Sequence, residues 1–105
     1  MREDLESLLR LAYRAGSVKF GFETLEKMKG DYFIILAKDL SEKTKRNIFY
    51  RFEVDVYQVW DKNKLSNLFG RNNLGVVIVK KDGLGKKIQA ILERSLKEAV
   101  LEEKR

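Results

Sequence analysis

The chain has 105 residues, of which 44% are hydrophobic and 10% aromatic, enough to fill the core of one small globular domain. It contains no cysteine and no histidine, which excludes disulfides, thiolate metal sites and imidazole chemistry at neutral pH. The formal net charge of +6 favours polyanionic partners, and the absence of an apolar run of about 18 residues excludes a membrane span.

Apolar residues at helical spacing predict the first element, a helix over residues 3–14 that ends at Gly16. A short strand at Val18–Phe20 is expected next, followed by a short helix from Gly21 to Lys29. The apolar run DYFIILA, residues 31–37, is rich in aromatic and branched side chains, which is typical of a strand covered on both faces. We therefore expect it to be a central strand.

The second half of the chain continues the same alternation. Residues 41–52 are expected to form a helix capped by its first residue, a serine, and residues 54–59 a second strand. An aspartate at position 61 and a glycine at position 70 bound the next predicted helix, and LGVVIV, residues 74–79, predicts another doubly covered strand. A long helix is expected from Gly83, with its last five residues frayed.

The regular alternation of apolar strands and amphipathic helices indicates the fold class. No proline, linker, repeat or low-complexity stretch interrupts the pattern. We therefore expect one α/β domain over residues 1–105, with helices on both faces of a small sheet of about four strands. The first ten residues mix acidic and basic side chains and do not have the pattern of a signal peptide, so the expected location is cytoplasmic.

The positive charge is concentrated in two segments. Residues 38–51 carry five basic and two acidic side chains, and residues 71–87 carry five basic and one acidic. The segments on either side are close to neutral. If the fold brings the two basic segments to one side, they form a patch suited to phosphates; otherwise they form a basic surface that keeps the protein in solution.

The stretch AGSVKFGFETLEK, residues 15–27, has two glycines five positions apart and invites comparison with a phosphate-binding loop. A nucleotide P-loop places lysine and a hydroxyl residue directly after its second glycine, whereas Phe22 and Glu23 stand there in this chain. The stretch also follows a predicted helix, whereas a P-loop follows a strand. A nucleotide P-loop is therefore disfavoured.

Four lysines between residues 80 and 87 surround Gly83 and Gly85 in the stretch KKDGLGKK. Two interpretations stay open: an anion site, which would support a nucleotide or small-ligand enzyme, or a strand-to-helix turn that needs glycine for backbone reasons. Six acidic residues lie singly at the ends of predicted elements, and the sequence nominates no nucleophile, general base or metal cluster; they are Glu23, Asp31, Asp39, Asp55, Asp61 and Asp82. We therefore expect a non-catalytic protein without a metal or small-molecule cofactor.

Three turns are expected to converge at one end of the sheet, and their residue types suit RNA. They are the Gly16–Gly21 loop, the KDLSEKTK turn from residue 38 and the GRNNLG loop from residue 70. They are expected to offer exposed glycine amides and several cations for phosphates: Lys19, Lys27, Lys38, Lys43, Lys45 and Arg71. Side chains suited to base edges or 2′-hydroxyl groups are Glu23, Thr24, Asn72 and Asn73. Phe20 and Phe22 either stack on bases or belong to the core.

Four segments, taken in order and spacing, carry a resemblance to a known family. They are LLRLAYRAGSVKFGFETLEKMK, YFIILAKDLSEKTKRNI, VDVYQVWDKNKLSNLFGRNN and LGVVIVKKDGLGKKI. Together they resemble the kink-turn-binding ribosomal-protein family, especially its bacterial YlxQ-like branch, over residues 5–88. The resemblance implies a three-layer α/β/α sandwich with a small mixed sheet that binds structured RNA.

The resemblance places RNA contacts at the start of the second helix and in the loop before the last strand. It implies RNA-binding roles for Lys19, Gly21 and Lys27. The asparagine and glutamate that meet sheared guanines in the best-known members of the family fall at Glu23 and Thr24. The apolar-tipped loop of the family is more polar here, and its residues are Arg71, Asn72, Asn73 and Leu74. Altered RNA specificity is therefore expected.

These observations predict a non-catalytic RNA-binding protein, ribosomal or ribosome-associated, that recognises structured, kink-turn-like RNA. The candidate RNA-binding residues are Gly16, Lys19, Gly21, Glu23, Thr24, Lys27, Lys38, Lys45, Arg71, Asn72, Asn73 and Leu74. The alternative is a protein-interaction module of the same fold that has lost RNA binding. The carboxylate of Glu23, which would repel phosphate, is the sequence feature that favours this alternative.

Overall fold

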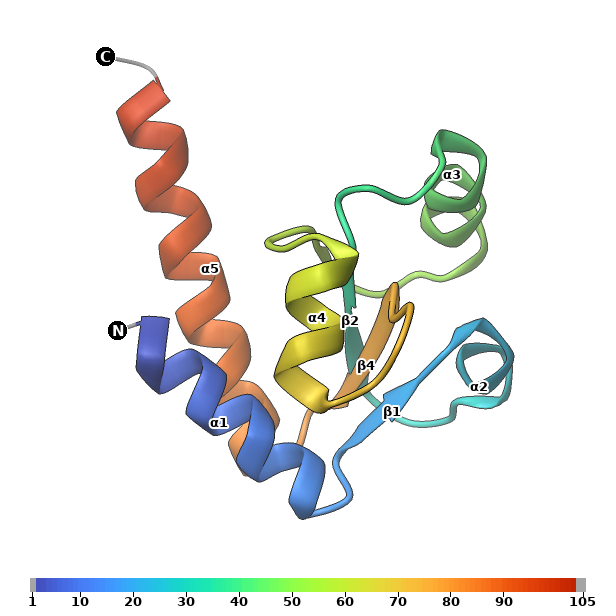
Figure 1. Cartoon of the computed structure of the whole chain (residues 1–105), viewed down its shortest axis with the longest axis horizontal. Helices are drawn as coiled ribbons and strands as arrows, with labels where there is room; N and C mark the ends of the chain where they lie inside the picture. The colour runs from blue at the N-terminus through green and yellow to red at the C-terminus, as the bar shows by residue number, and fades with distance from the viewer. Residues whose placement is uncertain (1, 104–105) are drawn as a thin grey trace.

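Within residues 2–103, whose backbone the structure describes, four strands form one mixed sheet in the order β1-β4-β2-β3 (Figure 1). They are β1 (Val18–Phe20), β2 (Tyr32–Leu36), β3 (Val56–Tyr57) and β4 (Val76–Lys80). Strand β4 runs antiparallel to both β1 and β2, whereas β2 and β3 are parallel. The structure is a computed structural model, and its side chains are described for residues 5–96.

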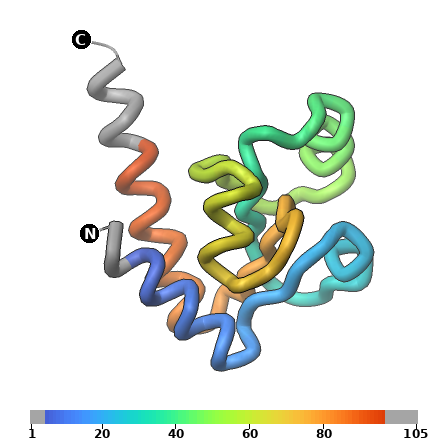
Figure 2. Tube along the Cα trace, viewed as in Figure 1, coloured from blue at the N-terminus to red at the C-terminus, as the bar shows by residue number. Residues whose placement is uncertain are grey.

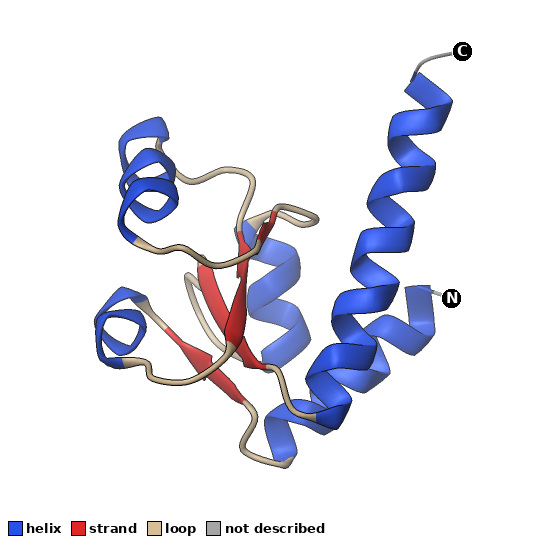
Figure 3. Ribbon diagram, turned by 180° about the vertical axis from the view of Figure 1, so that it is seen from behind, coloured by secondary structure: helices blue, strands red, loops and turns tan. Residues whose placement is uncertain are grey.

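Five helices of the described chain cover the two faces of this sheet and make a three-layer α/β/α sandwich, as predicted (Figure 3). They are α1 (Arg2–Arg14), α2 (Phe22–Lys27), α3 (Glu42–Arg51), α4 (Lys62–Phe69) and α5 (Gly83–Glu103). Helices α1, α4 and α5 lie on one face, and α2 and α3 lie on the other. The trace in Figure 2 shows α1 and α5, which come from opposite ends of the chain, side by side.

The two central strands are covered on both faces, which explains their unbroken apolar sequences. All five residues of β2 and the first four of β4 are buried. Successive residues of a strand point to opposite faces, so each strand supplies two separate cores. Phe33 and Ile35 pack on the side of α1, α4 and α5, whereas Ile34 and Leu36 pack on the side of α2 and α3. The prediction of a central strand within residues 31–37 is confirmed.

Polar caps and a glycine set the helix ends near the predicted positions. The Ser41 hydroxyl accepts a hydrogen bond from the Thr44 N–H at 3.2 Å, at the start of α3. The Asp61 carboxylate accepts one from the Lys64 N–H at 2.9 Å, at the start of α4. Helix α4 ends at Gly70, which is left-handed with a φ of 64°. These local interactions fix where the two helices begin and where α4 stops.

The edge strand β3 is much shorter than the predicted strand over residues 54–59. Val56 and Tyr57 are the residues that pair with β2. Val54 packs into the core beneath α2 and α3, and Val59 and Trp60 pack against the opposite core. The alternating pattern in this stretch therefore indicates which side chains are buried. Buried side chains occur in the residues before and after the strand as well as in the strand itself.

Side-chain hydrogen bonds tie β3 to helix α5. The Tyr57 hydroxyl donates to a Glu93 carboxylate oxygen at 2.8 Å and accepts from the Gln89 side-chain amide at 2.8 Å. The same amide donates to the Asp55 carboxylate at 2.7 Å. Burial raises the pKa of Tyr57 from its ordinary value of 10.0 to about 12, so its hydroxyl stays protonated and keeps donating in alkaline solution where an ordinary tyrosine ionises.

Two further boundaries differ from the predicted ones. Strand β4 begins at Val76 and not at Leu74, although Leu74 is buried in the loop before it. Helix α2 covers Phe22–Lys27, within the predicted span of residues 21–29. Helix α5 begins at Gly83 as expected, and the predicted fraying of residues 101–105 concerns residues that lie partly outside the described chain.

The turn from β4 into α5 requires glycine at position 85. A Cβ atom there would lie 1.8 Å from the Lys80 carbonyl oxygen. The Asp82 carboxylate caps the helix, since it accepts from the Gly85 N–H at 2.8 Å and from the Ser17 hydroxyl. Of the two interpretations of KKDGLGKK, the strand-to-helix turn is the one that this geometry favours, because a carboxylate occupies the position that an external anion would need.

Replacing Gly85 with alanine is therefore expected to be costly. The new Cβ forces the start of α5 away from β4, and we expect the free energy of unfolding to fall by about 2–3 kcal/mol. Gly83→Ala is the matched control, because a Cβ at Gly83 meets nothing within 4 Å. Urea unfolding of both variants measures the difference, and equal stability of the two would contradict the close approach.

Asp82 is expected to make stability depend on acid pH. Hydrogen bonds from the Ser17 hydroxyl and the Gly85 N–H hold the pKa of Asp82 below its ordinary value of 3.8. The stabilisation is therefore complete well above pH 3.8 and is lost as the pH falls below that value, towards the lower folded-state pKa.

Asp82→Asn keeps a capping oxygen but removes the charge. We expect a loss of about 0.5–1 kcal/mol at neutral pH, and a shallower fall of unfolding free energy between about pH 5 and pH 2 than in the wild type. Urea titrations at a series of pH values measure both quantities. An acid dependence as steep as that of the wild type would show that Asp82 is not responsible.

Candidate nucleic-acid interface

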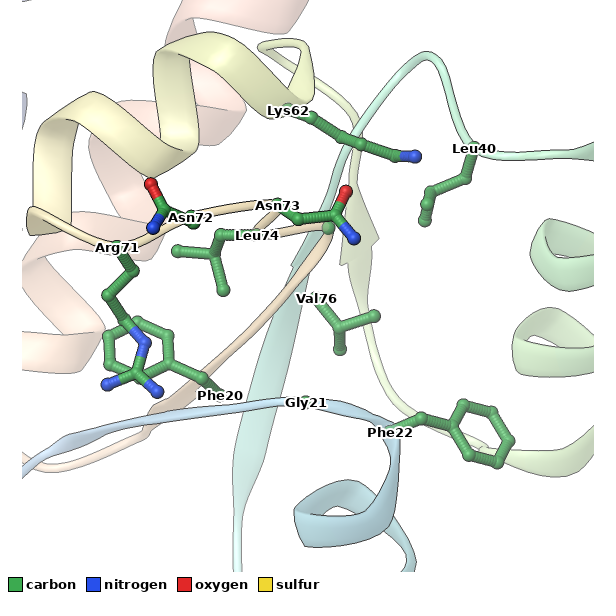
Figure 4. A pocket seen from close by; sticks show the side chains of 11 residues that line it. Phe20, Gly21, Phe22, Leu40, Lys62, Arg71, Asn72, Asn73, Leu74 and Val76 are labelled. Atoms are coloured by element: carbon green, nitrogen blue, oxygen red, sulfur yellow. The ribbon is translucent and has the colours of Figure 1, made fainter.

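The strand directions bring four loops to one edge of the sheet. The carboxyl ends of β1, β2 and β3 meet the amino end of β4 there, because β4 is antiparallel to β1 and β2. The loops enclose an open cleft of about 360 Å³, which we call the rim cleft (Figure 4). Its lining residues are Phe20, Gly21, Phe22, Leu40, Lys62, Arg71, Asn72, Asn73, Leu74, Gly75 and Val76. Three segments remote in sequence, around residues 21, 40 and 71–76, therefore converge as expected.

Gly21 forms the β1 side of the rim cleft. Its φ of 94° is a conformation that glycine adopts without strain, and it lets the chain turn directly from β1 into α2. Its N–H donates to the Val76 carbonyl at 3.1 Å, and the Gly16 N–H donates to the Tyr13 carbonyl at 3.1 Å. The expectation that these two glycine amides are exposed for a ligand is therefore wrong, because the backbone already uses both.

The loop between α4 and β4 forms the opposite side of the cleft and is held by Ser66. The Ser66 carbonyl accepts from the Arg71 N–H, and the Ser66 hydroxyl accepts from the Leu74 N–H, both at 2.9 Å. Asn73 has a φ of 52°, a left-handed conformation that asparagine tolerates better than most residues. Leu74 is 5% exposed, so it anchors the loop in the core. The loop thus presents a fixed backbone to the cleft.

An aromatic cluster positions Arg71 in the cleft. Its guanidinium carbon lies 4.6 Å from the centroid of the Phe20 ring, as Figure 4 shows. That ring packs edge-to-face against Tyr13 and Phe69, each with a centroid distance of 5.2 Å. Arg71 forms no ion pair within the described part of the chain. A cation stacked on a ring keeps its N–H donors directed outward for an anionic ligand.

Lys62 is a cleft residue that the sequence analysis missed. It is the first residue of α4, and its N–H donates to the Asp39 carboxylate at 3.0 Å, which joins α4 to the β2–α3 loop. In Figure 4 its side chain extends across the cleft towards Leu40. The signal that could have identified it is the capping residue Asp61, because a helix that starts right after β3 must start at this edge of the sheet.

Several other predicted site residues lie outside the rim cleft. Gly16 is at the opposite edge of the sheet, in the loop between α1 and β1, so its predicted place beside Gly21 is wrong. Lys19 pairs with Ile78 across β1 and β4 and is exposed on the face covered by α2 and α3. Lys38 is exposed in the β2–α3 loop, at the same edge as the cleft but not in its lining.

The predicted residues of α2 and α3 are also separate from the cleft lining. Glu23 and Thr24 lie in the first turn of α2 and Lys27 in its last turn, and Glu23 and Lys27 are exposed. Lys45 lies on α3, half-buried, with its Nζ 3.6 Å from the Glu42 carboxylate. The structure thus gathers Gly21, Arg71, Asn72, Asn73 and Leu74 in the cleft lining and leaves the other candidates outside it.

Phe20 and Phe22 are half-buried and packed against other aromatic rings, which favours the core interpretation for both. The Phe22 ring lies 6.2 Å from that of Phe52, and in Figure 4 it points away from Phe20. Base stacking needs an open ring face, and a guanidinium already lies over each ring: Arg71 over Phe20 and Arg51 over Phe22.

The rest of the described chain offers little for other chemistry. No three acidic side chains of residues 5–96 approach closely enough to hold a metal ion. None of the helices in residues 2–103 combines the length and apolar composition that crossing a bilayer demands. The chemical character of the site is therefore that of an open cleft with cationic and amide side chains at its mouth.

These features define the chain as an α/β/α sandwich with a basic cleft at one edge of a mixed sheet. Its structure is similar to that of a protein of unknown function from Bacillus halodurans, with a TM-score of 0.70 and 25% sequence identity. The similarity covers 85% of this chain and 96% of the other. The chain matches no protein-family model and no curated protein sequence. The comparison supports the fold.

Removing the Ser66 hydroxyl is expected to loosen the α4–β4 loop. Ser66→Ala leaves the Leu74 N–H without its acceptor, and we expect the free energy of unfolding to fall by about 1–2 kcal/mol. Ser95→Ala is a suitable control, since Ser95 is exposed on α5 and should lose no stability. Thermal unfolding measures stability, and amide hydrogen exchange at Leu74 reports the loop; slow exchange in Ser66→Ala would refute the assigned role.

Proposed function

We propose that this protein binds structured RNA without catalysing a reaction, and that its RNA is ribosomal or ribosome-associated. The rim cleft is the proposed contact surface for phosphates and base edges at a folded, kink-turn-like internal loop. The observation that carries the proposal is that Lys62, at the start of α4, and Arg71 and Asn73, in the loop after α4, meet at one open cleft. Cations supply affinity for phosphates, and amide side chains supply hydrogen bonds to bases.

The shape of the surface favours folded RNA over duplex DNA. Readers of the DNA major groove present a helix or a two-stranded ribbon to the base edges. Here the cations Lys62 and Arg71 lie at the two ends of α4, around a short cleft, and not along a helix face. Helix α2, on the other side of the cleft, has six residues and an exposed carboxylate, Glu23, in its first turn. Such a surface matches the irregular backbone and splayed bases of an RNA internal loop.

The resemblance to the kink-turn-binding ribosomal-protein family supports the same assignment. In that family the start of the second helix and the loop before the last strand enter the RNA, and both segments border the rim cleft in this chain. Glu23 and Thr24 replace the asparagine and glutamate of the best-known members. A carboxylate cannot donate a hydrogen bond and repels phosphate, so we propose that the RNA specificity differs from theirs.

The second candidate function is protein interaction through the same fold, and exposed Glu23 beside the cleft is the observation that favours it. The two functions predict different copurification behaviour. A protein partner would remain bound after nuclease treatment and at high salt, whereas RNA-mediated complexes would dissociate.

Charge removal in the cleft tests the RNA proposal. We expect the double variant Lys62→Gln, Arg71→Gln to bind a kink-turn hairpin RNA about tenfold or more weakly at about 50 mM salt. The slope of log affinity against log salt should fall by about 1–2, because two phosphate contacts are lost. Fluorescence anisotropy with labelled RNA measures both quantities.

The matched control is Lys86→Gln, Lys87→Gln, which removes the same charge from the opposite edge of the sheet. Both lysines are exposed in the first turns of α5 and form no ion pair within the described chain. We expect this control to keep most of the wild-type affinity. Equal losses in both variants would mean that net charge, and not the cleft, governs binding, and no binding by the wild type would refute the proposal.

A further inference from the structure

The outer face of α3 carries cations and an unusually exposed aromatic ring. Lys43, Arg46 and Tyr50 lie three, four and seven positions apart, so they share one side of the helix. Tyr50 is 83% exposed, whereas Ile48 on the inner side of α3 is fully buried. A tyrosine this exposed contributes little to the core, and its ring is free to stack on another planar group.

A groove beside this ring gives a partner room to bind. It has a volume of about 530 Å³ and is lined by Glu42, Lys45, Arg46, Phe49, Tyr50 and Gln58. Phe49, which is 48% exposed, adds a second aromatic surface. Gln58 comes from the segment that follows β3, so the groove lies between α3 and the outermost strand of the sheet, β3.

The charges on α3 are divided between paired and available groups. Lys45 pairs with Glu42, and Arg51 pairs with Glu26 at 2.9 Å. Lys43 and Arg46 are exposed and form no ion pair within the described residues. The surface around Tyr50 is therefore electropositive and complementary to phosphates.

Helix α3 is also continuous with the rim cleft. Leu40 lines the cleft, and the next residue, Ser41, caps α3. The helix has ten residues, so it leads away from the cleft for about 15 Å. A strand of RNA that leaves the cleft beside Leu40 has a direct route along the helix.

We propose that the outer face of α3 binds unpaired nucleotides that flank the structured RNA, with a base stacked on Tyr50 and phosphates on Arg46 and Lys43. The inference rests on the proposed function of the rim cleft. An exposed aromatic ring next to a row of cations is the arrangement that proteins use for single-stranded nucleic acid without sequence preference. An apolar protein partner would need a wider patch, and Phe49 and Tyr50 are the large apolar side chains of α3 that are strongly exposed.

The test measures the affinity of three proteins, the wild type, Tyr50→Ala and Tyr50→Phe, for each of three RNA probes. The probes are a kink-turn hairpin, the same hairpin with a single-stranded uridine flank of about ten nucleotides, and the oligouridine alone. We expect the flank to strengthen wild-type binding about five- to tenfold and Tyr50→Ala to abolish that gain. Tyr50→Phe should retain it, because phenylalanine keeps the stacking surface. Tyr50 is so exposed that none of the variants should unfold.

Each outcome separates the two proposals. If the hairpin does not bind but the oligouridine does, and Tyr50→Ala weakens it, the rim-cleft proposal fails and the α3 surface stands. If the hairpin binds and the flank adds nothing, or adds as much in Tyr50→Ala, the α3 proposal is overturned. The α3 proposal would also be overturned if Tyr50→Ala lost the binding of a protein partner but bound all three RNA probes as tightly as the wild type.

Discussion

The antiparallel pairing of β2 with β4 determines the arrangement of most of the molecule. Five residue pairs join the strands, from Tyr32 with Lys80 to Leu36 with Val76. Both strands are buried on both faces, so a shift of one residue would exchange the side chains of the two cores. The pairing is therefore fixed, and it carries the α4–β4 loop to the same edge as the loops after β1 and β2. The rim cleft is a consequence of this strand direction.

A second contact fixes the layer formed by α2 and α3. The Arg51 guanidinium lies 5.4 Å from the ring centroids of both Phe22 and Phe52, and it bonds to the Glu26 carboxylate at 2.9 Å. This cation therefore joins the two helices, and its guanidinium is already bonded within the protein. On the outer face of α3, Lys43 and Arg46 have no such partners within the described chain. The unpaired positive charge of the helix therefore lies on the same face as Tyr50.

The sequence predicts the elements whose causes are local, and it misses features that depend on strand direction. Unbroken apolar runs identify β2 and β4, and Ser41 and Asp61 identify helix starts, because burial and capping act within a few residues. Gly16 is expected at the wrong edge of the sheet because the three residues of β1 are too few to predict strongly as a strand, and this strand separates Gly16 from Gly21. The stacking of Arg71 on Phe20 joins distant parts of the chain, and no local pattern indicates it.

The two proposed surfaces differ in how firmly their cations are held, and this difference sets what each can recognise. Arg71 rests on Phe20 in a loop fixed by Ser66, so little conformational entropy is lost when it meets a phosphate. Lys43 and Arg46 extend from an open helix, and ordering each costs about 0.5–1.5 kcal/mol. Rigid donors discriminate among RNA shapes, whereas flexible cations add attraction that tolerates any sequence. In the proposed binding mode, shape selection therefore belongs to the rim cleft, and the α3 face strengthens binding without changing which RNA is chosen.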